Sequence, residues 1–143
     1  MDSYEKYEKE CKRIKLVNKG LLTNFEAWLT SSGLAPKTAA KHVSNIDFFI
    51  NEYLMHEEPC EACEGVDQVS SYLGHWFILH AMWASPGSIR RNAASVKKFY
   101  AFMLENGLVS QQSVDDLAQM IKQEMPKWIA QVERYDDEMD DGY

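Results

Sequence analysis

The sequence of 143 residues lacks a long hydrophobic run, a secretory signal and a disulfide framework. No stretch of about 18 uncharged apolar residues occurs, so the sequence predicts no membrane association through a transmembrane helix. The opening segment, MDSYEKYEKECKRIK, is charged throughout, unlike a secretory signal peptide. The cysteines are Cys11, Cys60 and Cys63, and this odd number favours a reducing compartment, which we expect to be the cytoplasm. No P-loop, Rossmann or Ser–His–Asp pattern occurs, so we expect no small-molecule substrate and no cofactor.

What the sequence does contain is typical of a single all-α domain. Apolar residues make up 45% and aromatic residues 12% of the chain, which is enough for one buried core. Helical periodicity dominates and strand-like alternation is absent, which predicts a compact bundle of five or six helices. We divide the chain into a charged N-terminal lead-in helix (1–19), a helical domain (20–134) and an acidic flexible tail (135–143).

Apolar stripes and capping residues set the expected helix positions. The expected helices cover residues 3–17, 20–33, 35–54, 66–83 and 85–107, and a last one starts at Ser113 and is interrupted by Pro126. Ser85 is a typical capping residue. Pro36 and Pro86 fall in first turns, where the missing N–H of proline costs nothing.

The helix at 66–83 is apolar on nearly every side, so we expect it at the centre of the bundle. His75 and His80 lie on it, and we expect them to be core histidines whose ring nitrogens are hydrogen-bonded inside the protein. The four tryptophans are expected in the core as well: Trp28, Trp76, Trp83 and Trp128.

The net charge of −7 is unevenly distributed along the chain. Five acidic residues lie between Glu57 and Asp67, and five more lie between Asp136 and Asp141, with no lysine or arginine in either segment. Without these two groups of five, the rest of the chain carries +3. The body of the domain is therefore mildly basic, and the acidic total does not exclude a polyanionic partner.

The helix expected at 85–107 has a strongly basic face. On a projection at about 100° per residue, its cations occupy an arc about 120° wide, away from the apolar side. Ser88 and Asn92 add uncharged hydrogen-bond donors near the N-terminus of this helix, and a helix N-terminus itself attracts phosphate. Either this face binds a polyanion such as duplex DNA, or it is an ordinary solvated helix face. The cations are Arg90, Arg91, Lys97 and Lys98.

The stretches APKTAAKHVSNIDFFINEYL and SPGSIRRNAASVKKFYAFML match each other at an offset of 50 residues. Lys37, Thr38 and Lys41 repeat the basic face more weakly on the earlier copy. Two copies predict pseudosymmetry within one bundle rather than a solenoid. The matched pairs are Pro36 and Pro86, Thr38 and Ser88, Lys41 and Arg91, Ile46 and Val96, Phe49 and Phe99, and Leu54 and Leu104.

The stretch SIRRNAASVKKFYAFMLENGLV resembles the second signature of the N-terminal core-binding domain of tyrosine recombinases, the phage-integrase and Xer-like family. That signature runs Thr/Ser-Ile, an Arg two positions on, small residues, Lys/Arg, Phe-Tyr, a Leu-rich turn and Asn-Gly. GLAPKTAAKHVSNIDFFINEYL is similar to the first signature, and VSSYLGHWF fits the helix between them, so the resemblance covers about residues 20–110. The second signature is matched by Ser88-Ile89, Arg91, Ala93-Ala94-Ser95, Lys97, Phe99-Tyr100, Met103-Leu104 and Asn106-Gly107.

The resemblance implies a SAM-like helical bundle, here with an extra C-terminal helix, that clamps one face of a recombination site. Two positions depart from the pattern, because Ala35 replaces the usual capping Ser and His42 replaces a common Tyr. The expected partner is double-stranded DNA, with a separate recombinase catalytic chain or a second copy of this chain as further partners. The residues implied to contact DNA are Lys37, Thr38, Lys41, Ser88, Arg90, Arg91 and Lys97, and the basic face adds Asn92 and Lys98.

The catalytic domain of that family is absent from this chain. Its chemistry requires Arg, Lys, a His-x-x-Arg group and a tyrosine nucleophile, and none of the four histidines here has arginine three residues later. Tyr135 and Tyr143 lie in an acidic tail that would repel phosphate. We therefore expect no enzymatic DNA cleavage. The initiating Met and the acidic tail favour a complete short protein over a fragment.

Two further features leave alternatives open. His56, Cys60 and Cys63 have spacings that can ligate zinc, but a C-x₂-C pair without a second pair is incomplete, so we expect an acidic surface loop without a metal. Phe48 falls on the polar side of its helix, where it is either an exposed aromatic residue or part of a contact surface. The alternative function is a protein-interaction module of the same fold that has lost DNA affinity and uses Phe48 or the acidic segments.

Overall fold

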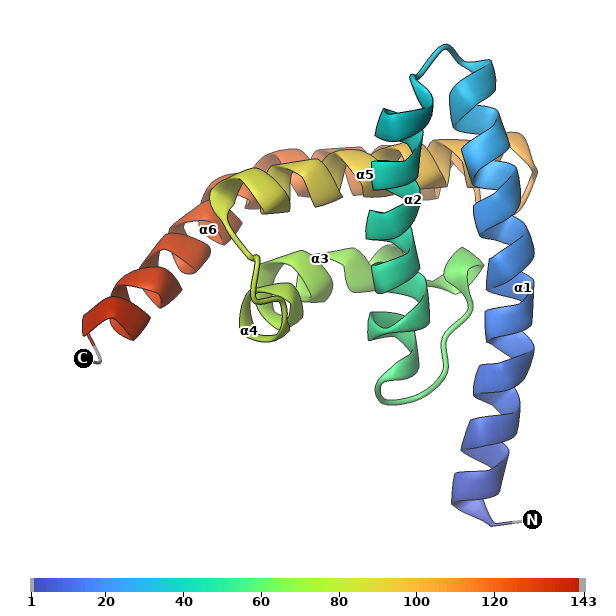
Figure 1. Ribbon diagram of the computed structural model, residues 1–143, viewed down its shortest axis with the longest axis horizontal. Coiled ribbons are helices and arrows are strands. Elements are labelled where there is room, and N and C mark those ends of the chain that lie inside the picture. The colour runs from blue at the N-terminus through green and yellow to red at the C-terminus, as the bar shows by residue number, and fades with distance from the viewer. Residues whose placement is uncertain (1, 142–143) are drawn as a thin grey trace.

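The computed structural model describes residues 2–141 as a bundle of helices without a strand in that range (Figure 1). The long helices are α1 (Ser3–Ser31), α2 (Pro36–Asn51), α5 (Pro86–Glu105) and α6 (Gln111–Asp141). Between α2 and α5 lie η1 (Tyr53–Met55), η2 (Ala62–Glu64), η3 (Val66–Gln68), α3 (Val69–Ser71), η4 (Tyr72–Trp76) and α4 (Phe77–His80). The all-α prediction is confirmed. Over the described part of the chain, no helix has both the length and the apolar character needed to span a bilayer.

Two pairs of helices form the framework of the bundle. α1 packs along α2, α5 packs along α6, and the second pair crosses the first (Figure 1). Phe25 of α1 and Phe99 of α5 are fully buried where the pairs meet, and Phe49 of α2 is fully buried against Tyr72 of η4, with ring centroids 4.8 Å apart. The rings of Phe25 and Phe99 meet edge to face with centroids 5.3 Å apart, an arrangement that aromatic pairs favour. This ring contact ties α1 to α5.

The predicted starts of α2 and α5 are confirmed, because each begins at its proline. Ser85 Oγ accepts a hydrogen bond from the Ser88 backbone N–H (3.0 Å), and Ser88 Oγ accepts one from the Ser85 N–H (2.8 Å). These reciprocal bonds form a capping box that satisfies two backbone donors. α5 ends before Gly107, whose φ of 71° favours glycine.

α1 is longer than predicted, because the helices expected at 3–17 and 20–33 form one helix. The boundary that we placed at residue 19 is therefore not a break in the helix. Gly20 lies in the middle of α1, and a glycine there costs only about 1 kcal/mol relative to alanine. Buried Ile14 and Phe25 pack on either side of it and offset this cost.

α6 is also longer and less interrupted than predicted. Ser110 rather than Ser113 caps it, because Ser110 Oγ accepts from the Ser113 N–H at 3.1 Å. The prediction that Pro126 interrupts the helix was wrong, because α6 continues through it. A proline inside a helix costs about 3 kcal/mol of stability, and the burial of Ile121 and Trp128 on either side offsets this cost. The segment from residue 135, expected to be flexible, continues α6 through residue 141, and residues 142 and 143 lie outside the described part.

The central helix expected at 66–83 is divided into η3, α3, the π-helical turn η4 and α4. Only one side of this stretch packs inward, through residues that include Tyr72 and Phe77. His75 and His80 lie on the exposed side, so the prediction that they are core histidines was wrong. The expected hydrogen bond to a protein group is nevertheless present at His80, whose Nδ1 lies 2.9 Å from the Trp76 carbonyl oxygen, and its ring stacks on that of Trp76 with centroids 4.4 Å apart.

The tryptophans differ in burial, and the prediction that all four are core residues holds fully for one of them. Trp128 is buried, whereas Trp28 and Trp76 are partly buried at the edge of the core. Trp28 Nε1 donates a hydrogen bond to Glu105 Oε2 at 2.6 Å, which ties α1 to the end of α5. Trp83, in the loop before α5, is 56% exposed, and that position was predicted wrongly.

Candidate nucleic-acid interface

α2 and α5 meet through a small polar junction centred on Ser95, which is fully buried. Asn45 Nδ2 donates to Ser95 Oγ at 3.0 Å, and His42 Nδ1 lies 2.7 Å from the same oxygen. Ser95 Oγ itself donates to the backbone carbonyl of Arg91 at 3.0 Å. Because a hydroxyl group has a single hydrogen, His42 Nδ1 is the donor in its contact with Ser95. The junction fixes the two helices relative to each other.

The predicted cations lie on the outer faces of these two helices. Those of α5 are exposed except for Lys98, which is half-buried, and both lysines of α2 are exposed. The ion pairs of the described residues join Arg13, His56 and Lys127 to neighbouring glutamates, and none involves the cations of α2 or α5. These cations are therefore uncompensated charges that are available to phosphates. They are Lys37 and Lys41 on α2, and Arg90, Arg91, Lys97 and Lys98 on α5.

Arg91 lies back over the first turn of α5. A Cβ atom at Gly87 would be 3.1 Å from Arg91 Nη1, so the glycine leaves room for the guanidinium beside the helix N-terminus. The positive end of the helix dipole and the guanidinium charge therefore lie at the same end of α5.

The start of α2 is open in a different way. Ala35 stands at the capping position, and within the described residues no side chain caps the helix. The first backbone hydrogen bond runs from the Ala39 N–H to the Ala35 carbonyl at 2.9 Å. The N–H groups of Lys37 and Thr38 precede that bond, and such first-turn donors bind anions readily. Thr38 is exposed, as predicted.

Two of the predicted contact residues lie inside the protein. Ser88 is 3% exposed and Asn92 is 4% exposed. Ser88 takes part in the capping box, and Asn92 Nδ2 donates to the Ser88 backbone carbonyl at 2.8 Å. Their expected position on the basic surface was wrong, because helix capping and packing use their polar groups.

The polar junction lies in the positive field of the α5 face. Burial, and then the charge of Lys98, lower the pKa of His42 below its ordinary value of 6.5. A protonated imidazole would add a further positive charge beside Lys98 in a partly desolvated place. His42 is therefore neutral near pH 7, and its titration reports on charges that approach this part of the surface.

The acidic loop with the two neighbouring cysteines follows α2 and turns back alongside α1 (Figure 1), where Arg13 pairs with Glu61 at 3.1 Å. Burial, and then nearby carboxylates, raise the pKa of both the Cys60 and the Cys63 thiol. Raised thiol pKa values disfavour the thiolates that bind zinc. Within the described residues, no group of three or more His, Cys, Asp and Glu side chains is arranged to hold a metal ion.

Comparison with protein-family models, with curated proteins and with solved structures found no match to this chain. The resemblance to recombinase core-binding domains therefore rests on the residues quoted above. Sequence reasoning missed the junction at Ser95. A signal for it was present, because Asn45 and Ser95 occupy matched positions in the two similar stretches.

Proposed function

We propose that this chain is a non-catalytic DNA-binding domain that contacts duplex DNA mainly through its phosphates. The observation that carries the proposal is the set of uncompensated cations on α2 and α5, two helices that the Ser95 junction holds together. Phosphate contacts by Lys and Arg supply most of the non-specific affinity for DNA. The finer proposal is a SAM-like relative of the recombinase core-binding domain that acts in the cytoplasm.

Two helix starts strengthen this proposal. At α2, the open N–H groups of the first turn lie next to Lys37 and Lys41. At α5, the guanidinium of Arg91 lies over the first turn. Each start combines a dipole with a fixed cation, which is an arrangement suited to phosphate oxygens. Arg90 is exposed as well, and an arginine side chain can also fork onto guanine in the major groove.

In this proposal the chain supplies DNA affinity and no chemistry. Tyr135 is partly buried against the core on α6, which does not suit a nucleophile that must reach a phosphate. Tyr143 lies outside the described residues. A separate recombinase chain would supply the catalytic groups, and a second copy of this chain would bind the other half of a symmetric site.

A salt titration of duplex binding tests the proposal. The association constant of the wild type should fall with salt, with a slope in log–log form of about 0.9 per phosphate contact. The triple variant Arg90→Ala, Arg91→Ala, Lys97→Ala should bind every duplex at least about tenfold more weakly, and its slope should be lower by about 2.7.

The matched control changes the same amount of charge elsewhere. Lys6, Lys9 and Lys12 are exposed on the half of α1 that is farthest from the start of α2 (Figure 1). Their triple alanine variant should keep nearly the wild-type affinity and slope. If both triple variants lost the same amount of DNA affinity, net charge rather than this face would explain the binding. If binding did not depend on salt, phosphate contacts would not be its source.

A protein-interaction role is the second candidate, and an apolar surface around the end of α4 favours it. Leu79 is 48% exposed, Met82 is 99% exposed and Trp83 is 56% exposed. Such clustered apolar side chains are typical of contact surfaces. Absence of duplex binding at low salt would leave this candidate as the better one.

A further inference from the structure

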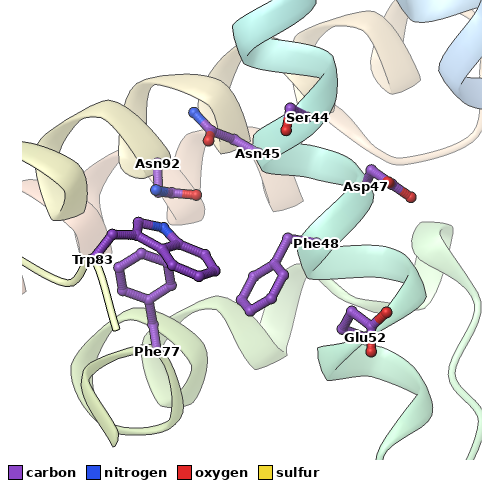
Figure 2. Close-up of a pocket in the computed structure, with 8 residues that line it drawn as sticks. All are labelled: Ser44, Asn45, Asp47, Phe48, Glu52, Phe77, Trp83 and Asn92. Carbon is purple, nitrogen blue, oxygen red and sulfur yellow. The ribbon is translucent and has the colours of Figure 1, made fainter. Parts of the chain in front are cut away.

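A cavity of about 260 Å³ opens beside the crossing of α2 and α5. Three aromatic rings form its wall, and Figure 2 shows them converging from α2, from α4 and from the loop before α5. The ring of Phe48 lies 5.2 Å from that of Trp83 at 65°, and Phe77 stands at 84° to Trp83 with their centroids 6.2 Å apart. Phe77 is buried at the base, whereas Trp83 is 56% exposed at the mouth.

The polar lining of this cavity includes two amide oxygens that can accept hydrogen bonds. Asn92 Nδ2 donates to the Ser88 carbonyl, so the amide oxygen of this buried side chain is turned away from that bond and toward the cavity (Figure 2). Asn45 Nδ2 donates one of its two hydrogens to Ser95, and its amide oxygen accepts no hydrogen bond within the described residues. The Ser44 hydroxyl also lines the cavity.

Two carboxylates complete the lining, and no lysine or arginine contributes to it among the described residues. Asp47 and Glu52 stand on the α2 side, and Asp47 also accepts a hydrogen bond from Asn51 Nδ2 at 2.5 Å. Glu52 is exposed, and its carboxylate forms no ion pair within residues 2–138. Aromatic faces, neutral acceptors and negative charge together fit a cation.

We propose that this cavity binds the side chain of an arginine in a basic segment of a partner protein. The guanidinium group is planar, carries five N–H donors and has no acceptor. It can stack on the exposed indole of Trp83 while its donors reach the amide oxygen of Asn92, and the carboxylate of Glu52, farther along the lining, adds negative charge (Figure 2). This site is separate from the proposed phosphate contacts, because none of the cations on α2 and α5 lines it.

The same lining is less suitable for the other ligands that an aromatic cavity can bind. A lysine ammonium is a compact, strongly hydrated charge that cannot stack as a plane. A nucleotide would bring its phosphate close to Asp47 and Glu52, which repel it. The planar cation is therefore the ligand that uses both the indole face and the acceptors.

The test is an NMR titration of ¹⁵N-labelled protein with a short peptide that carries one arginine between uncharged residues. The Trp83 indole N–H and the Asn92 side-chain amide should shift and saturate together. The matching lysine peptide should bind at least about fivefold more weakly. Trp83→Ala should weaken binding of the arginine peptide by about tenfold, and Glu52→Gln should weaken it by about fivefold.

Matched controls separate this site from general charge and from folding. Met82→Ala removes a neighbouring exposed side chain that does not line the cavity, and Glu133→Gln removes an exposed carboxylate on α6. Both should leave the affinity for the arginine peptide unchanged. Glu52 is exposed, so Glu52→Gln should keep the wild-type circular dichroism spectrum and thermal midpoint. Trp83→Ala should keep the spectrum but lower the midpoint, because the indole also packs on Phe48 and Phe77.

Three results would overturn the proposal. The first is equal binding of the lysine peptide, and the second is tighter binding of cytidine or adenosine monophosphate than of the arginine peptide. The third is the absence of shifts at Trp83 and Asn92 at millimolar peptide. DNA duplex binding is measured on the same samples. A protein that binds DNA but not the arginine peptide would contradict only the cavity proposal, and one that binds the peptide but not DNA would contradict only the proposed function.

Discussion

Asn45 and Ser95, which occupy equivalent positions in two similar helices of this chain, are hydrogen-bonded to each other at 3.0 Å where those helices cross. The pseudosymmetry of the sequence thus has a physical counterpart, because the two copies pack on each other through matched residues. The contact is buried on the Ser95 side and also involves His42.

Ser95→Ala should destabilise the protein by about 1–2 kcal/mol, because Asn45 and His42 each lose a partner in a partly buried place. Urea unfolding followed by circular dichroism measures the change. Ser44→Ala, one residue from Asn45 but exposed, should change stability by less than about 0.5 kcal/mol. A loss that is no larger for Ser95→Ala than for Ser44→Ala would show that the junction does not stabilise the crossing.

Stability should fall as the pH drops from 7.5 toward 5, and His42 should contribute to that fall. Its pKa is lowered in the folded state, so the unfolded chain binds more protons below its ordinary value of 6.5. The contribution is present above pH 6.5 and is lost as the pH falls through the lowered pKa. Unfolding curves measured at several pH values, with His42→Gln as the comparison, follow this contribution.

Lys98→Met should raise the pKa of His42, because it removes the positive charge that adds to the effect of burial. Lys97→Met is the matched control, since Lys97 is exposed on the same helix and is not a cause of the shift. NMR titration of the His42 ring protons measures the pKa of His42 in both variants. Equal pKa values in the two variants would contradict the proximity of Lys98 to the junction.

Gly20→Ala and Gly74→Ala should change stability in opposite directions. A Cβ at Gly20 meets no atom within 4 Å in the middle of α1, so alanine should stabilise the helix by about 1 kcal/mol. A Cβ at Gly74 would lie 2.6 Å from Trp128 Nε1, so alanine there should cost about 1–3 kcal/mol. Thermal melting of the two variants measures this, and stabilisation by Gly74→Ala would mean that α6 packs less closely on η4 than described.

Tyr72→Phe and Tyr100→Phe form a second matched pair. Within the described residues, the buried Tyr72 hydroxyl has no hydrogen-bond partner, so removing it should leave stability unchanged or raise it by about 1 kcal/mol. The Tyr100 hydroxyl donates to the Ala62 carbonyl at 2.8 Å, so its loss should cost about 1–2 kcal/mol. Urea unfolding compares them, and the opposite order would be inconsistent with these contacts.

The sequence predicted those features that depend on local chemistry. Pro36 and Pro86 mark the starts of α2 and α5, and Gly107 marks the end of α5, because each acts within one helical turn. The break expected near residue 19 and the interruption at Pro126 were not found. At both places, packing between distant segments outweighs a local cost of a few kcal/mol.

The candidate site was predicted in part for the same reason. The exposed cations of α5 follow from helical periodicity, which separates them from the buried stripe. Periodicity could not place Ser88 and Asn92, since they lie on the margin between the two faces and pack inward. Neither could it bring Phe48 together with Phe77 and Trp83, because Phe48 lies on another helix, far earlier in the chain than the other two.

Chemical-shift mapping with a short DNA duplex tests the central claim most directly, because it locates the contact surface residue by residue. Backbone amides in the first two turns of α2 and along the exposed face of α5 should shift on addition of DNA, and the effect should weaken with salt. The amide signals of residues near Lys6, Lys9 and Lys12 should not shift. Shifts confined to α1 or to the loop around Met82, with none in α2 and α5, would contradict the account.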